Sequence, residues 1–143
     1  MSKPILHGFF GSPFVRSVGM LLLEKGVEFD HNKINVPEGG PGEPEHLARH
    51  AFGKVPVLEH DGMMIAETAS ILDYVDAVFP EGPSFTPTDL KEKARMDTGI
   101  AFAGNYGASS LVLAVAAYHL FPEFIGGQNE ESRRYGIAGG GWC

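Results

Sequence analysis

The sequence contains little that would serve a disulfide, a cysteine-based metal centre or a membrane span. Its single cysteine is Cys143, which excludes an internal disulfide and a zinc site built on several cysteines. The most apolar run, residues 111–120, is interrupted by His119 and falls short of the roughly 20 residues that a membrane helix needs. Residues 1–10 lack the pattern of a signal peptide. We therefore expect a cytoplasmic protein with no membrane partner.

Positive charge is also scarce. The 143 residues include 11 Lys and Arg against 18 Asp and Glu, which gives a net charge of −7. Binding to a phosphate backbone requires a clustered excess of positive charge, so a nucleic-acid partner is not expected. A hydrophobic fraction of 43% with 20% charged residues is typical of a globular protein. The length suffices for one compact domain and part of a second.

The first third of the chain has the pattern of a strand, a helix and a second strand. Pro4–Phe9 is a short apolar run, and Ser12 with Pro13 forms a strong helix start. Apolar residues at helical spacing continue to Gly26, a residue that favours a helix end. Residues 28–36 contain a second strand candidate. A strand–helix–strand unit of this length indicates parallel pairing through a right-handed crossover.

The next segment predicts a short helix, a hairpin and a longer helix. A loop rich in glycine and proline precedes a helical piece at residues 45–50. Two short strands, Val55–Leu58 and Met63–Ile65, flank Asp61-Gly62, a strong hairpin signal. Apolar residues at helical spacing then run to Val78. The order β-α-β-α-β-β-α describes an α/β fold with a mixed sheet, which is the thioredoxin-like arrangement.

A linker and a helical segment follow. We expect a first domain over residues 1–80, a proline-rich linker over 81–88 and a partial all-helical domain over 89–143. Thr88-Asp89 is a suitable cap for a long helix that runs to about Phe121, and a second helix is expected to begin near Glu130. The glycines of residues 139–141 would end that helix, because each loses about 1 kcal/mol relative to alanine in a helix.

Three motifs stand in a fixed order along the first domain. They are Gly11-Ser12-Pro13-Phe14-Val15-Arg16, Gly53-Lys54-Val55-Pro56-Val57-Leu58 and Glu67-Thr68-Ala69-Ser70-Ile71. Each motif alone is weak, but the ordered set over residues 3–80 resembles the N-terminal domain of serine-type cytosolic glutathione transferases, the tau, phi, theta and zeta classes. The resemblance implies that glutathione is a co-substrate, that no metal is used, and that a homodimer acts in detoxification.

The resemblance assigns Ser12 to catalysis. On its own, Ser-Pro at a helix start is most often only a cap. A thiol with an ordinary pKa of about 8.5 is mostly protonated at neutral pH. A hydroxyl that donates a hydrogen bond to the sulfur at a helix N-terminus favours the thiolate, which is the nucleophile. A cysteine at position 12 would instead favour thiol–disulfide exchange, so an oxidoreductase is the less favoured interpretation.

The same resemblance assigns the glutathione ligands. Pro56 corresponds to a cis-proline that exposes the backbone of Val55 for pairing with the cysteinyl part of glutathione. Lys54 is a candidate partner for a glutathione carboxylate, with an exposed hairpin lysine as the alternative. Glu67 and Thr68, at a helix start, would bind the γ-glutamyl moiety, where free amides and the helix dipole favour an anion.

Two departures from the family pattern concern the glycyl carboxylate of glutathione. Glu43 and Glu45 stand where many relatives carry a basic residue, so His46 or Lys54 would have to compensate. His50-Ala51 replaces the usual Asn-Pro. His46 and His50 also have a spacing that can hold a metal, but no third ligand stands at a convincing distance, and we expect no metal.

The family's C-terminal domain is an all-helical bundle, and here we expect a truncated form of it. Apolar residues at 111–121 would lose their usual partners, which predicts poor stability or association through this face. Two functions follow from the sequence. One is a transferase that conjugates glutathione to a hydrophobic electrophile; the other is a non-catalytic module that binds glutathione or a protein partner.

Overall fold

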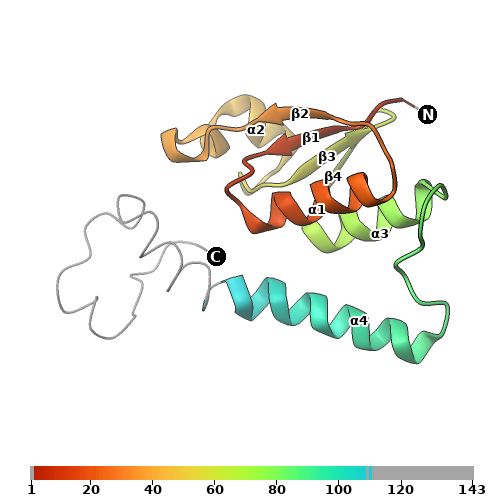
Figure 1. Ribbon diagram of the computed structural model, residues 1–143. Helices are drawn as coiled ribbons and strands as arrows, with labels where there is room; N and C mark the ends of the chain where they lie inside the picture. The colour runs from red at the N-terminus through yellow and green to blue at the C-terminus, as the bar shows by residue number, and fades with distance from the viewer. Residues whose placement is uncertain (1, 109, 111–143) are drawn as a thin grey trace. The chain divides into compact units, whose positions relative to one another are not determined.

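A computed structural model describes residues 2–108 and 110. The first 88 residues build a four-stranded sheet in the order β2-β1-β3-β4 (Figure 1). Strand β1 (Ile5–Gly8) pairs parallel with β2 (Asp30–Lys33) and antiparallel with β3 (Val57–His60), and β3 pairs antiparallel with β4 (Met63–Ala66). The mixed sheet and its connections confirm the predicted thioredoxin-like fold class.

Helix α1 (Pro13–Glu24) follows β1, where the sequence predicts a helix start. Ser12 has the extended backbone of an N-cap residue, and Pro13 fits the first helical position because no partner is needed for an N–H there. The helix buries Val15, Val18 and Leu22 against the sheet. It ends before Gly26, whose φ of +70° suits glycine.

The segment between β2 and β3 is more structured than a plain loop. Two short 3-10 turns, η1 (Val36–Glu38) and η2 (Gly40–Gly42), precede helix α2 (Pro44–Arg49). Gly39 links the two turns with a φ of +85°. Only the last of the three short helices was expected from the sequence, because turns of three residues carry no periodic apolar pattern.

The predicted hairpin forms, with one correction to its first strand. Asp61 and Gly62 both have positive φ, 47° and 77°, as a two-residue hairpin turn requires. Pairing begins at Val57 and not at Val55 as the apolar run suggested. Pro56 has no N–H to donate to a strand ladder, so the residues before it stay outside the sheet.

Helix α3 (Thr68–Val78) lies beside α1 on one face of the sheet (Figure 1). The core between the sheet and these helices consists of fully or nearly fully buried apolar side chains: Leu6, Val15, Val18, Leu22, Leu58, Ile71, Val75 and Phe79. This core holds the ends of β1, β3 and β4 in a fixed relation, and those ends carry the three sequence motifs.

The chain divides into two compact units, Met1–Thr88 and Asp89–Cys143. In the second unit, helix α4 (Leu90–Phe102) is capped by Asp89, whose carboxylate accepts from the amides of Lys91 and Glu92 at 3.0 Å. Residues 103–108 continue as a π-helical turn. The remainder of the predicted long helix, and the helix expected near residue 130, lie outside the described residues. Within the described part, no helix has the length and apolar character to span a membrane.

Candidate functional site

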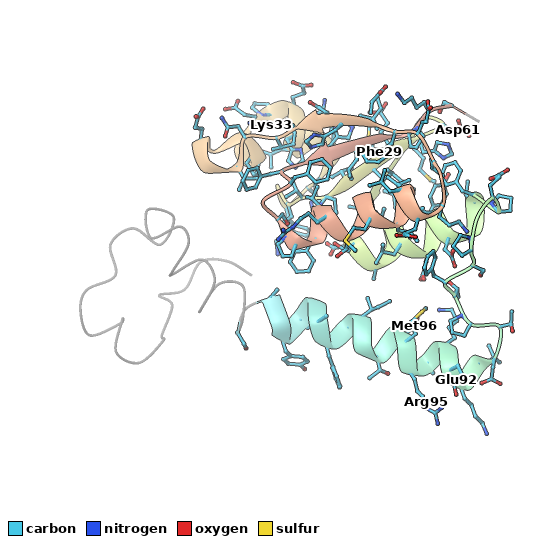
Figure 2. All side chains as sticks on the ribbon, in the orientation of Figure 1. Phe29, Lys33, Asp61, Glu92, Arg95 and Met96 are labelled. Atoms are coloured by element: carbon cyan, nitrogen blue, oxygen red, sulfur yellow. The ribbon has the colours of Figure 1, made fainter. Side chains whose placement is uncertain are left out.

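The strand register brings the three sequence motifs to one end of the sheet. His7 in β1 pairs with Val57 at the start of β3, and Val57 pairs with Ala66 at the end of β4. The segments that follow β1, precede β3 and follow β4 therefore meet at this end. Figure 2 shows Lys33 at the same end, whereas Phe29 and Asp61 lie at the opposite end.

Ser12 occupies the head of α1 with its hydroxyl uncommitted. Its amide donates to the carbonyl of Phe9 at 2.8 Å, and its carbonyl accepts from Arg16 at 3.1 Å. The half-buried side chain makes no capping bond to the helix amides, and within the described part of the chain it has no hydrogen-bond partner. A hydroxyl donor and the positive end of a helix dipole thus coincide at one position.

Val55 presents a free peptide edge beside this helix start. The Val55–Pro56 bond is cis, which is the isomer that the family resemblance implies. Val55 is half-buried, and neither its N–H nor its carbonyl is paired with another group among residues 2–108. An unpaired donor and acceptor on one residue can pair with an extended peptide in the manner of an added strand.

The start of α3 supplies a second group of unpaired amides. The N–H groups of Thr68, Ala69 and Ser70 meet no backbone acceptor in the described structure, and the first intrahelical bond runs from Ile71 to Glu67 at 3.0 Å. Free amides at a helix N-terminus bind anions. Glu67 is exposed and has a φ of +67° and a ψ of 122°, a conformation that few non-glycine residues adopt.

His50 lies next to Glu67. Its Nε2 is 3.8 Å from the Glu67 carboxylate, and its Nδ1 accepts from the amide of Phe52 at 3.1 Å. Burial lowers the pKa of His50, and the nearby charge of Glu67 opposes that shift. Because Nδ1 is an acceptor, the neutral ring carries its proton on Nε2, toward Glu67. The sequence indicated only that His50 stands in place of the asparagine of the usual Asn-Pro. Its contact with Glu67 arises from the fold and could not be predicted from the motif.

His46 and Lys54 prove to be connected to each other. The His46 side chain is 1% exposed, and its Nε2 lies 2.9 Å from the carbonyl oxygen of Lys54. This burial corrects the expectation that His46 could serve the glycyl carboxylate of glutathione, because a ligand cannot reach it. The Lys54 residue itself is exposed, so a ligand beside Val55 can reach its ammonium.

His7 forms a second buried polar group on the sheet. Its Nδ1 is 2.9 Å from the amide nitrogen of Asn32, and its Nε2 is 3.0 Å from the Glu59 carboxylate. An amide nitrogen donates, so Nδ1 accepts and Nε2–H faces Glu59. Burial lowers the pKa of His7, and the bond to Glu59 acts in the opposite direction. This arrangement links β1, β2 and β3 and is structural.

Two further features lie apart from this site. An open depression of about 460 Å³ lies at the opposite end of the sheet, lined by Lys3, Leu23, Gly26, Val27, Glu28 and Phe29. It contains none of the three motifs. Across the described residues, no three His, Cys, Asp or Glu side chains are gathered in a way that could hold a metal ion.

Comparison with known proteins identifies the family. A family model described as the N-terminal domain of glutathione S-transferase matches residues 6–83. The chain belongs to the glutathione S-transferase family. Among curated relatives, glutathione S-transferase U10 of Arabidopsis thaliana is 33% identical over 71% of this chain and 43% of the relative. Glutathione transferase GST 23 of Zea mays is 37% identical over 67% of this chain and 42% of the relative.

A solved structure agrees with this family membership. A glutathione transferase homolog from Drosophila mojavensis, crystallised with bound glutathione, superposes with a TM-score of 0.77 and 27% identity, over 96% of this chain and 62% of that one. The chain spans about half the length of the curated relatives that it matches. The matched part includes the whole end of the sheet where the three transferase motifs meet.

Proposed function

We propose that the chain binds glutathione at this end of the sheet and activates its thiol for conjugation. In this proposal the backbone of Val55 pairs with the cysteinyl part. The free amides of α3, with Thr68 and Glu67, bind the γ-glutamyl part, and Lys54 faces a carboxylate of the peptide. Ser12 then lies where the sulfur would be. The observation that carries the proposal is the uncommitted Ser12 hydroxyl at the head of α1.

The chemistry requires one interaction from Ser12. The thiol releases its proton to water, and the Ser12 hydroxyl donates a hydrogen bond to the resulting anionic sulfur. The sulfur then forms a bond to the electrophilic carbon, which expels its leaving group or takes up a proton. A hydrogen bond to a charged group contributes about 1.5–3 kcal/mol, which lowers a thiol pKa by about one to two units. At pH 7 this raises the thiolate fraction about eight- to 25-fold.

Replacement of Ser12 by alanine tests the proposal. We expect the Ser12→Ala variant to bind glutathione within about threefold of the parent, because the free amides remain. Its kcat/KM for conjugation at pH 7 should fall by about eight- to 25-fold, in proportion to the thiolate fraction, and the acidic limb of its pH profile should shift upward. Ser12→Thr retains the hydroxyl and is the matched control. Unchanged turnover in Ser12→Ala refutes the role of Ser12.

A hydrophobic electrophile, a homodimer and a cytoplasmic location are extensions of this proposal that rest on the family. A binding test combined with a conjugation assay separates the non-catalytic alternative. Retention of the 143-residue chain on immobilised glutathione without conjugation of any electrophile would select a binding module. The exposed carboxylate of Glu43 favours weak glutathione affinity in either case, since it repels a carboxylate. The carboxylate of Glu45, in α2, is paired with Arg49 and contributes less to this repulsion.

A further inference from the structure

The buried side chain of His46 reaches the peptide that joins Lys54 to Val55. Its Nε2 lies 2.9 Å from the Lys54 carbonyl oxygen. A carbonyl oxygen can only accept a hydrogen bond, so Nε2 carries the ring proton and donates the hydrogen bond. The Lys54–Val55 peptide is trans and planar, so its C=O and N–H point in opposite directions. A bond that fixes the Lys54 carbonyl therefore fixes the direction of the Val55 N–H.

The segments on both sides of the Lys54–Val55 peptide are fixed, so the main motion left to this peptide is rotation of its plane. On one side Gly53 has a φ of +58° and approaches Pro41 so closely that an added Cβ would lie 2.6 Å from the Pro41 carbonyl oxygen. On the other side Val57 is paired in the sheet. A peptide plane between two anchored segments can still rotate about its long axis by opposite changes in ψ and φ. The hydrogen bond from His46 selects one orientation.

A buried histidine at position 46 is destabilising unless its hydrogen bond to the Lys54 carbonyl compensates for the cost of burying the ring. Its Nδ1 is buried and has no hydrogen-bond partner within the described part of the chain. A buried polar atom without a partner is destabilising, and an apolar side chain of similar size would avoid the penalty. The interaction that offsets this loss is the bond to Lys54, which ties α2 to the peptide edge of the site.

We infer that His46 is a positioning residue that aims the Val55 N–H at the cysteinyl part of glutathione. The inference rests on the proposed function, since it assigns a role within the same site. His46 touches no ligand in this role, because its side chain is 1% exposed. It acts through the Lys54 carbonyl alone.

Two variants of nearly equal shape separate positioning from packing. Methionine and glutamine are both unbranched and of similar length, and methionine adapts well to irregular core space. Only glutamine retains an N–H donor at the place of Nε2. We expect His46→Met to bind glutathione about tenfold more weakly, and His46→Gln to stay within about twofold of the parent. Both variants should unfold within a few degrees of the parent.

A measurement without glutathione keeps this inference separate from the proposed function. In the free 143-residue protein, the Val55 amide signal in a nitrogen–proton NMR spectrum should shift or broaden in His46→Met and remain in place in His46→Gln. Ring-nitrogen shifts of the parent should show a proton on Nε2 of His46. If the parent fails to bind glutathione, the proposed function is wrong while the Val55 signal still tests the positioning. If His46→Met leaves both the Val55 signal and the glutathione affinity unchanged, the inference is overturned.

Discussion

The ammonium group of Lys25 lies 3.0 Å from the carboxylate of Asp76, and the two side chains are only 1% and 5% exposed. Lys25 follows the last residue of α1, and Asp76 belongs to α3. Lys25 also donates to the carbonyl of Pro83 at 3.1 Å, while Asp76 accepts from the amides of Phe85 and Thr86. One buried pair thus connects two helices and the segment that leaves them.

Replacing Asp76 by asparagine should destabilise the first unit strongly. The change leaves the ammonium of Lys25 buried without its counter-charge, and breaking a buried pair in this way removes about 3–5 kcal/mol from the free energy of unfolding. Urea denaturation followed by circular dichroism measures the loss. Asp30→Asn is the matched control, because the Lys3–Asp30 pair is 47% and 62% exposed and an ion pair screened by water in this way contributes little to stability. Equal losses in both variants would contradict the prediction.

Acid should lower the free energy of unfolding of the parent more than that of the Asp76→Asn variant. Burial alone would raise the pKa of Asp76, but hydrogen bonds from Thr86, Lys25 and Phe85 outweigh it and lower the pKa to about 2, against an ordinary 3.8. The unfolded chain binds this proton at higher pH, so the stabilisation is complete above about pH 4 and is lost as the pH falls toward 2. The difference amounts to about 2 kcal/mol.

Unfolding free energies at pH 5 and at pH 2 check this expectation. Other carboxylates titrate in both proteins, so the excess loss in the parent isolates Asp76. A pH dependence that is the same in the parent and in Asp76→Asn would show that the carboxylate is not held by these bonds.

The elements that the sequence predicted are those fixed by neighbouring residues. Ser12 with Pro13 determines a helix start through the extended backbone of Ser12 and the preset φ of Pro13, and Asp61-Gly62 determines a tight turn through positive φ. Both signals lie within a few positions of the structure that they dictate. The parallel pairing of β1 and β2 followed because a crossover helix leaves few other arrangements.

The interactions that the sequence did not predict join residues far apart in the chain. Lys25 and Asp76 are separated by 51 positions, and His7 and Glu59 by 52. A periodic pattern shows that such a position is helical or extended, but it carries no signal for which polar group will be buried opposite another. His46 and Lys54 are only eight positions apart, but here too the partner was not predicted: the place of His46 in α2 suggested an exposed ligand, and the fold turned its side chain inward to the Lys54 carbonyl.

Glu67→Gly should make the protein more stable and the site weaker. A non-glycine residue at a φ of +67° carries about 1–3 kcal/mol of backbone strain, and glycine relieves it while losing about 0.5–1 kcal/mol through greater freedom of the unfolded chain. The net expectation is a gain of about 1 kcal/mol in the free energy of unfolding. Glutathione affinity should fall about tenfold, because the carboxylate proposed to bind the γ-glutamyl part is gone.

Calorimetric titration with glutathione and urea denaturation measure the two effects on one protein sample. Asp61→Gly is the control, because Asp61 also has a positive φ, 47°, but lies in the β3–β4 turn at the opposite end of the sheet from the site. Its glutathione affinity should equal that of the parent. If Glu67→Gly binds glutathione as tightly as Asp61→Gly does, the Glu67 carboxylate does not bind the γ-glutamyl part. The positive φ of Glu67 would then serve only to begin helix α3.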